Sequence, residues 1–266
     1  TTEIYTLSLH DALPILDFIS EIDTALAALD FLHDPTAYAR QEELKAMRIC
    51  AKAIITFAER HAVEARRQAQ EATDHLRKLE LETIAAFCDH VRANAPANFW
   101  EALQYYWFVH LGVTTELNTW DSFCPGHLDR HIQPFYTEEL KNGTLSRQQA
   151  EELLQCFWIK FNNQPAPPKV GVTAAESGTY TDFSQINIGG ILANGTDGVS
   201  EVSYLLLDVI EEMRLLQPSS SIQVSEENSD DFIRRAGKII RTGFGQPSVF
   251  NADLIVRELE IGRAHV

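Results

Sequence analysis

Residues 186–225 read INIGGILANGTDGVSEVSYLLLDVIEEMRLLQPSSSIQVS, and the order of elements in this stretch decides the fold class. Residues 186–188 are a short strand signal, and the two glycines at 189–190 allow the backbone to turn or to approach another group closely. Residues 200–216 have the apolar spacing of a helix, and residues 221–225 alternate as a second short strand. A strand, a helix and a strand in this order are typical of α/β architecture.

The same alternation continues towards the C-terminus. A helix is expected from a cap at Ser229 or Asp230 to Arg241, followed by a short strand at 248–250 and a last helix that begins near residue 251. We therefore predict a helix-rich α/β fold whose strands gather at a centre.

Helices are also expected in five places before residue 165. They cover residues 16–32, 38–72, 79–93, 99–112 and 148–161. The fourth is apolar nearly all round, which predicts a buried core helix. The fifth has Ser146 as its N-cap and Gln149 three residues later, as in a capping box. Between these two helices, Pro125 and Gly126 break the helical pattern.

Composition excludes several classes of protein. The formal net charge of −16 argues against a nucleic-acid surface, which needs basic side chains. No apolar run approaches the length of a membrane span. The four cysteines are far apart and form no Cys-x-x-Cys pair, so reduced thiols in the cytoplasm are the simplest interpretation.

The two ends of the chain resemble translated sequencing adapters. Residues 1–15, TTEIYTLSLHDALPI, and residues 260–266, EIGRAHV, each match one reading frame of a common adapter. We expect both to be artefacts and the natural part to be residues 16–259 of a longer protein. The alternative is a genuine amphipathic start and a frayed tail.

Residues 165–190 form a long polar stretch, rich in Gly, Pro, Ser and Thr. Long connections in compact domains tend to be functional. Asp182 and Phe183 follow a group of hydroxyl side chains that includes Ser177. Polar groups beside an apolar wall are what a small-molecule site needs, so we expect a ligand-binding loop here.

Two acidic residues lie on segments that are not expected to be helical. Taken alone, Asp121 and Asp182 are each interpreted more simply as turn or capping residues. If both met in one pocket, they could bind a cationic amine or act as acid and base.

Other chemically interesting side chains have simpler interpretations. Cys124 lies on an apparent loop with His127 three residues later, but a small buried apolar residue is favoured over a reactive thiol. His110 is expected to be a core histidine with satisfied hydrogen bonds. His127 and His131 flank Asp129 with metal-ligand spacing, but no third ligand is evident and we expect no metal site.

Three stretches resemble the glycyl radical enzymes of the pyruvate formate-lyase-like superfamily. Residues 122–136 resemble its Pro-Gly-Arg-Phe-Asp-Gln segment, and residues 186–225 resemble its segment with Asn-Glu-(Leu/Val)-Ser-Tyr and Gln-Pro-Ser. Residues 169–190 are most similar to the trans-4-hydroxy-L-proline dehydratase subgroup. The resemblance covers nearly all of residues 16–259 and implies part of a ten-stranded α/β barrel wrapped by helices.

By the same resemblance, Asp121, Ser177, Asp182 and Phe183 fall where that subgroup lines its substrate pocket. Two departures matter. Residues 127–130 read HLDR instead of Arg-Phe-Asp-Gln, and the sequence contains neither the Gly-Cys-x-Glu motif of the thiyl cysteine nor the Arg-Val-x-Gly-Tyr motif of the radical glycine. We therefore expect no catalytic residue in this chain, and no turnover by the chain alone.

The implied parent is a hydro-lyase that converts hydroxyproline to pyrroline-5-carboxylate. The resemblance implies a glycyl radical installed by a partner activating enzyme that uses S-adenosylmethionine and an iron–sulfur cluster, and a homodimeric, cytoplasmic parent. One alternative is a sister glycyl radical enzyme of the glycerol, choline, isethionate or formate-acetyltransferase type. The other is a non-catalytic helical interaction protein.

Overall fold

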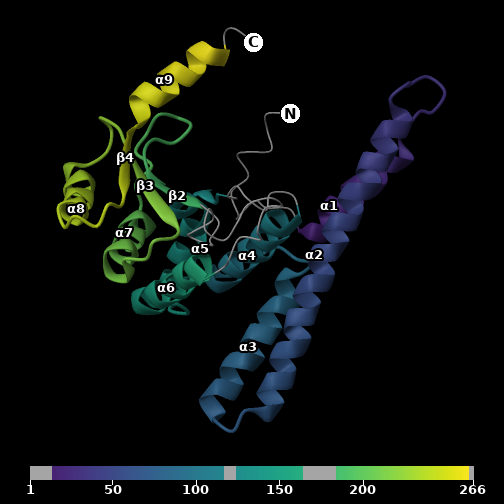
Figure 1. The fold of residues 1–266 in the computed structure, drawn as a ribbon, viewed down its shortest axis with the longest axis horizontal. Helices are drawn as coiled ribbons and strands as arrows, with labels where there is room; N and C mark the ends of the chain where they lie inside the picture. The colour runs from purple at the N-terminus through teal and green to yellow at the C-terminus, as the bar shows by residue number, and fades with distance from the viewer. Residues whose placement is uncertain (1–13, 117–123, 164–183, 264–266) are drawn as a thin grey trace, which may run out of the picture. The chain divides into compact units, whose positions relative to one another are not determined.

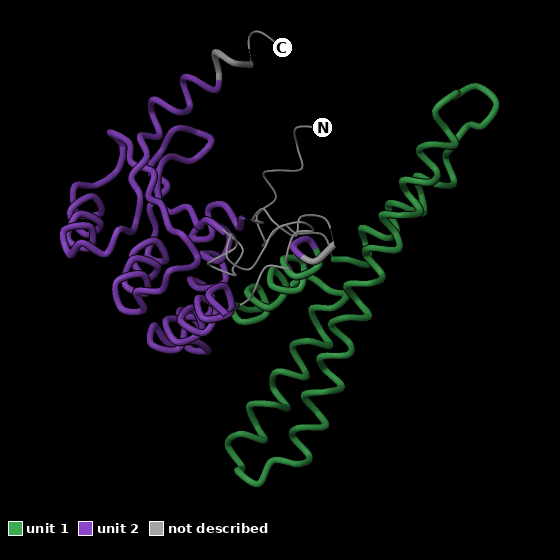
Figure 2. The backbone as a smooth tube through the Cα atoms, viewed as in Figure 1, with its two compact units in different colours: residues 1–112 green, residues 113–266 purple. Residues whose placement is uncertain are grey.

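The computed structural model describes residues 14–116, 124–163 and 184–263. Two compact units divide the chain, residues 1–112 and residues 113–266 (Figure 2).

The first unit is helical. Its elements are α1 (Ile15–Ala27), α2 (Ala37–Glu71), α3 (His75–Val91) and α4 (Phe99–Glu116), the last of which runs past the unit boundary (Figure 1). The helices α2 and α3 lie side by side and pack along a seam of small residues. Buried residues of these two helices include Ala58, Ala62, Ala65, Ala69, Leu81, Ala85 and Cys88. The sequence predicts α2 to within one residue at each end.

Single side chains explain two of the helix boundaries that differ from those that the sequence predicts. The helix α1 ends at Ala27 instead of continuing to residue 32. The carboxylate of Asp30 accepts hydrogen bonds from the backbone N–H groups of Leu32 and His33, at 3.0 and 3.1 Å, which competes with helical hydrogen bonding. The helix α3 begins four residues before the predicted start because Asp74 caps it, accepting from the backbone N–H of the second helical residue at 3.0 Å.

The second unit contains a parallel sheet with helical connections. Its elements are β1 (Gly126–His127), α5 (Leu128–Asn142), α6 (Arg147–Asn163), β2 (Gln185–Gly189), α7 (Glu201–Met213), β3 (Ser219–Val224), α8 (Asp230–Ile240), β4 (Ser248–Asn251) and α9 (Ala252–Arg263). The described strands pair in the order β1-β2-β3-β4, and every pair is parallel. Each of β1, β2 and β3 is therefore followed by at least one helix and then by its neighbour in the sheet, as expected for an α/β fold.

Side-chain caps explain where several helices begin and end. The hydroxyl of Ser146 accepts from the N–H of Gln149, whose side chain accepts from the N–H of Ser146, so the predicted capping box is present. Ser200 and Ser203 form an equivalent box at the start of α7, and Ser229 caps α8 as predicted. The helix α7 ends at Met213, before the predicted residue 216, because Arg214 adopts a left-handed conformation with φ of 47°.

The helix α5 is an element that the sequence analysis does not predict. Its buried residues are Leu128, Asp129, Ile132, Phe135 and Tyr136, which recur at helical spacing. The signal is obscured by Pro134 inside the helix, a residue that lacks an N–H, and by the break at residues 125–126 directly before it.

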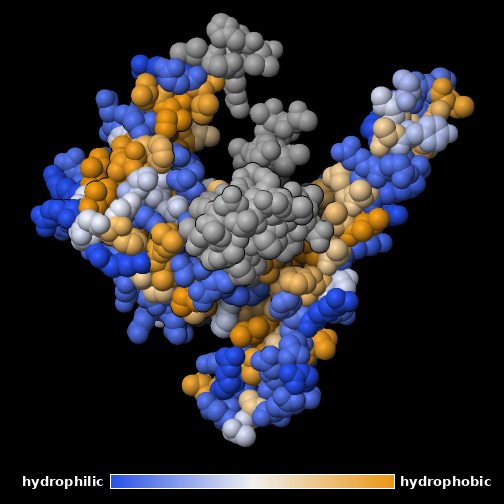
Figure 3. Space-filling model, viewed as in Figure 1, coloured by the Kyte–Doolittle hydropathy of each residue, from blue (hydrophilic) through white to orange (hydrophobic). Residues whose placement is uncertain are grey.

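Apolar side chains are exposed at the β4 edge of the sheet and on the helix that follows it (Figure 3). They include Val249, Phe250, Leu254 and Leu259. None of the described helices combines the length and the apolar character that crossing a membrane requires.

Candidate functional site

The two faces of the sheet differ in chemistry. On one face Ile186, Ile188 and Ile222 are at most 1% exposed. On the other face, strand register aligns His127, Asn187, Ser221 and Ser248 in one row across all four strands, which we call the polar row. A parallel sheet that is buried on both faces is ordinarily apolar on both, so a polar face indicates a surface built to meet polar groups.

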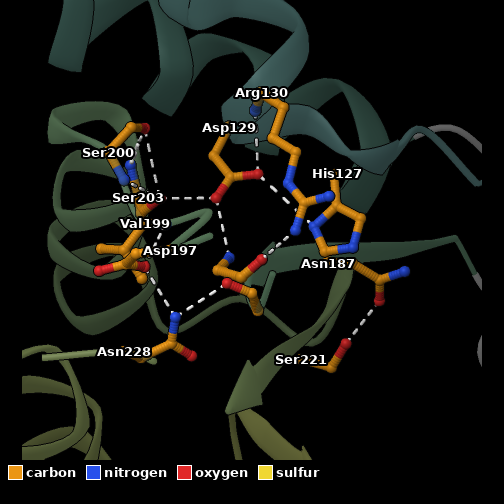
Figure 4. A network of polar contacts seen from close by, with 12 residues as sticks. His127, Asp129, Arg130, Asn187, Asp197, Val199, Ser200, Ser203, Ser221 and Asn228 are labelled. Carbon is orange, nitrogen blue, oxygen red and sulfur yellow. Dashed lines mark hydrogen bonds and ion pairs between the residues drawn. The ribbon is translucent and has the colours of Figure 1, made fainter. Parts of the chain in front are cut away.

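A hydrogen bond fixes the centre of the polar row. The hydroxyl of Ser221 donates to Oδ1 of Asn187 at 2.6 Å (Figure 4). Ser221 is fully buried and Asn187 is partly exposed. The bond therefore holds the Asn187 carboxamide in one orientation.

A buried carboxylate joins β1, β2 and α7 at the carboxyl ends of the strands. Asp129 follows β1 and is inaccessible to solvent. Its Oδ2 accepts from the backbone N–H of Gly189 at 2.8 Å and from the hydroxyl of Ser203 at 2.6 Å (Figure 4). Ser203 is in the first turn of α7, where the helix dipole favours a negative charge. Asp129 thus positions the end of β2 against the start of α7.

Two neighbouring side chains hold the carbonyl groups of the same turn. Arg130 donates to the carbonyl oxygen of Gly189 at 2.5 Å, and Asn228, which follows β3, donates to that of Gly190 at 2.8 Å. Asn228 also donates to Asp197 at 2.7 Å. Burial lowers the pKa of the Arg130 guanidinium, and the nearby charge of Asp129 opposes that shift.

The glycines at 189 and 190 are required by this turn. Both have left-handed φ values, 77° and 72°. A Cβ on Gly189 would lie 2.6 Å from the ring of Phe232, and one on Gly190 would lie 2.9 Å from Cβ of Gln223. The glycine prediction from the sequence, a turn or a close approach, is confirmed on both counts.

A further side chain repeats the arrangement between β3 and β4. Asp253, in the first turn of α9, accepts from the hydroxyl of Ser225 at 2.6 Å and from the N–H of Glu226 at 3.0 Å. These hydrogen bonds lower the pKa of Asp253. Asp129, Arg130, Asn228 and Asp253 together tie each strand end to the next, and we call them the strand ties.

The histidines beside this network belong to no cluster of metal ligands in the described residues. His127 Nδ1 lies 3.8 Å from Asp129 Oδ1, and burial lowers the pKa of His131. Across residues 14–116, 124–163 and 184–263, no group of three or more potential metal ligands is found. His110 is fully buried, stacks on Trp107 and contacts the hydroxyl of Tyr106 at 3.1 Å, which confirms a core histidine.

Cys124 is exposed, so the expectation of a buried apolar residue is wrong. It lies two residues before β1, where its sulfur accepts a hydrogen bond from the backbone N–H of Gln185 at 3.3 Å. The short β1 strand leaves this position at the rim of the sheet rather than inside it.

The four predicted pocket residues, Asp121, Ser177, Asp182 and Phe183, lie outside the described residues. The structure does describe the points at which their segments enter the sheet, at residues 124 and 184. Four polar groups of the sheet and its rim were not predicted from the sequence: Asn187, Ser203, Ser221 and Asn228. For Asn187 the available signal was a polar residue between two isoleucines.

Comparisons with known proteins agree with this architecture. A family model described as pyruvate formate lyase-like matches residues 15–264. The chain is 52% identical over 244 residues to trans-4-hydroxy-L-proline dehydratase of Clostridioides difficile, covering 92% of this chain and 31% of that protein.

Two solved structures are similar. The hydroxyproline dehydratase of C. difficile with trans-4-hydroxy-L-proline bound has a TM-score of 0.88 at 51% identity, covering 93% of this chain and 31% of that one. The glycerol-bound B12-independent glycerol dehydratase of Clostridium butyricum has a TM-score of 0.84 at 28% identity, with the same coverage. The chain therefore spans about a third of the length of these relatives.

Proposed function

This chain belongs to the pyruvate formate lyase-like family, and from that premise we propose that it is part of a glycyl radical dehydratase acting on trans-4-hydroxy-L-proline. The proposed product is pyrroline-5-carboxylate. Identity supports this substrate, because the chain is 52% identical to the hydroxyproline enzyme but 30% identical to an isethionate sulfite-lyase and 28% to the glycerol enzyme. The family match over residues 15–264 argues against an unrelated helical interaction protein.

One structural observation carries the proposal for the pocket. The strands β1 and β2 are adjacent and parallel, with Gly126 opposite Ile186, and Cys124 contacts the N–H of Gln185. Segments that lead into neighbouring parallel strands meet at the same side of the sheet, the one formed by the amino ends of the strands. Asp121 is three residues before Cys124, a reach of at most roughly 11 Å. Asp182 is three residues before Gln185, so this edge supports a pocket shared by both acids.

We assign the pocket residues by their chemistry. Hydroxyproline offers a carboxylate, a ring ammonium and a hydroxyl. Ser177 and nearby backbone N–H groups would hold the carboxylate, and Phe183 would supply an apolar wall. Of Asp121 and Asp182, one would pair with the ammonium, and the other, as a carboxylic acid, would help the 4-hydroxyl leave as water.

In this proposal the radical chemistry is supplied by residues and partners that this chain does not contain. When present, the cysteine thiyl and glycyl radical of the parent would supply hydrogen abstraction next to the ring nitrogen. We propose a partner activating enzyme that uses S-adenosylmethionine and an iron–sulfur cluster, a homodimeric parent in the cytoplasm, and no turnover by the 266-residue chain. The interpretation of residues 1–15 and 260–266 as adapter artefacts also stays a proposal, and the genomic reading frame tests it.

The experiment is an anaerobic assay of the full-length protein that contains this chain. After activation, mass spectrometry would follow pyrroline-5-carboxylate from hydroxyproline, with glycerol and isethionate as competing substrates. Asp121→Asn and Asp182→Asn should each lower kcat/KM by at least about a hundredfold, as for loss of an acid–base group. The matched control is Asp231→Asn, whose side chain is 86% exposed and pairs only with Arg234 among the described residues.

Two outcomes would reject the proposal. Faster turnover of glycerol or isethionate than of hydroxyproline would identify a sister enzyme. Variants at 121 and 182 that behave like the control at 231 would remove both acids from the pocket.

A further inference from the structure

The carboxamide of Asn187 is a prepared hydrogen-bond donor. Its oxygen already accepts from Ser221 at 2.6 Å, and Ser221 is fully buried, so the amide cannot turn over without losing that bond. No described residue accepts a hydrogen bond from its Nδ2, and the side chain is partly exposed. Two N–H groups therefore point away from Ser221 in a fixed direction (Figure 4).

His127 places a second hydrogen-bonding side chain beside Asn187 in the polar row. It is paired in register with Asn187 on the neighbouring strand, so both side chains project from the same face. Its Nδ1 is buried and lies 3.8 Å from Asp129 Oδ1, too far for a hydrogen bond. The side chain is 20% exposed, and no described residue hydrogen-bonds to its other ring nitrogen, Nε2, which can donate to an oxygen or accept from a hydroxyl.

The described part of this sheet face carries no permanent charge. The rows on either side of the polar row pair Gln185 with Ser219, and Gln223 with Phe250. The guanidinium of Arg130 is already held by the carbonyl oxygen of Gly189. A carboxylate is best matched by a cation with several N–H donors. A neutral hydroxyl is matched by the amide and imidazole present here.

We propose that Asn187 and His127 bind the hydroxyl end of the substrate, with Ser221 as the positioning residue that orients Asn187. This inference rests on the proposed function and deepens it, because the hydroxyl is the group that dehydration removes. It assigns a binding role to strand residues that are separate from the four residues of the proposed pocket. It also explains why the polar row carries no permanent charge, since the hydroxyl that it would bind is neutral.

Binding to the full-length protein tests the proposal without any radical, so the protein is not activated. Isothermal titration calorimetry would compare trans-4-hydroxy-L-proline with L-proline, which keeps the carboxylate and ammonium and lacks the hydroxyl. Asn187→Leu should weaken hydroxyproline binding by about tenfold, the effect of about one hydrogen bond, and leave proline binding within about twofold. Ser221→Ala should have the same selectivity and a smaller effect, about threefold.

Asn142→Leu is the matched control, because Asn142 is exposed at the end of α5. It should leave both affinities unchanged. Thermal unfolding checks that each variant is folded. If Asn187→Leu does not fold, Ser221→Ala decides the question, because it removes only one hydroxyl oxygen.

The outcomes separate this inference from the proposed function. If the wild type binds neither ligand, the proposed function fails and this inference fails with it. If the wild type prefers hydroxyproline and the variants keep that preference, only this inference is overturned. An equal loss for both ligands would also overturn it, since the row would then hold a group that the two ligands share.

Discussion

The α2–α3 pair and the parallel sheet are held together in opposite ways. The two helices are separated by three residues and meet through alanines, with their ion pairs on the outside. The sheet joins groups far apart in sequence through buried polar atoms, such as Asp129 and the N–H of Gly189, 60 residues away. Apolar packing tolerates small adjustments. A buried polar group that loses its hydrogen-bond partner, in contrast, destabilises the fold by its full desolvation penalty. Substitutions in the sheet should therefore cost more than those in the helix pair.

The largest effect is expected at Asp129. Asp129→Ala leaves the N–H of Gly189 and the hydroxyl of Ser203 without their acceptor inside the protein. The free energy of unfolding should fall by about 3–5 kcal/mol, as for removal of one partner from a buried charged network. Urea unfolding of the purified chain measures this, with Asp231→Ala as the exposed control. A loss no larger than that of the control would show that the strand ties do not stabilise the sheet.

Gly189→Ala should follow closely. The new Cβ would strain a backbone with φ of 77° and lie 2.6 Å from Phe232. We expect a loss of about 2–4 kcal/mol from backbone strain and overpacking together. Gly195 separates the two causes, because it has φ of 81° and a Cβ added there would meet no other atom within 4 Å. Gly195→Ala should cost only about 1 kcal/mol; equal losses would mean that close packing at Gly189 contributes nothing.

A substitution in the helix pair should cost less. Ala58 is fully buried in the first unit, so Ala58→Leu forces extra methyl groups into a packed seam. The expected loss is about 1–3 kcal/mol. Ala53→Leu, on an exposed part of the same helix, should be nearly neutral. If Ala58→Leu destabilised the chain more than Asp129→Ala, the contrast between the two regions would be reversed.

The smallest effect is expected from the exposed ion pairs of α2. Hydrogen bonds from Arg67 and then from Gln68 lower the pKa of Glu64 from 4.5 to about 2. A carboxyl group whose pKa is lowered by folding stabilises the fold above pH 4.5, and that contribution is lost as the pH falls towards 2. Arg67→Ala should raise the pKa of Glu64 part of the way back, measured by NMR titration. Arg77→Ala, on α3, is the control that should leave it unchanged.

The same contrast explains what the sequence could predict. The helix α2 follows from the helical spacing of its apolar residues, and the strands β2, β3 and β4 follow from short strand patterns between turn signals. The end of α1 and the start of α3 depend on single side chains, Asp30 and Asp74, which form local hydrogen bonds with the backbone. The periodicity of apolar residues gives no information about such bonds. The helix α5 was hidden by the proline inside it.

The site was only partly predictable. Residues 165–190 and the two acids could be singled out by composition and resemblance, and they remain predictions. The pairing of Asn187 with Ser221, 34 residues later, depends on strand register. Register cannot be deduced from either strand alone, because the alignment of β2 with β3, such as Ile186 with Ser220, depends on both strands together.

The strand order also bears on synthesis. Because the order is β1-β2-β3-β4 and each pair is parallel, every strand docks on one that the ribosome has already released. The sheet can therefore grow in the direction of translation, and each strand tie is synthesised just after one of the two strands that it joins. At every stage the sheet extends at one edge, that of the newest strand, so a chaperone that shields this strand would protect the edge at which the next strand docks.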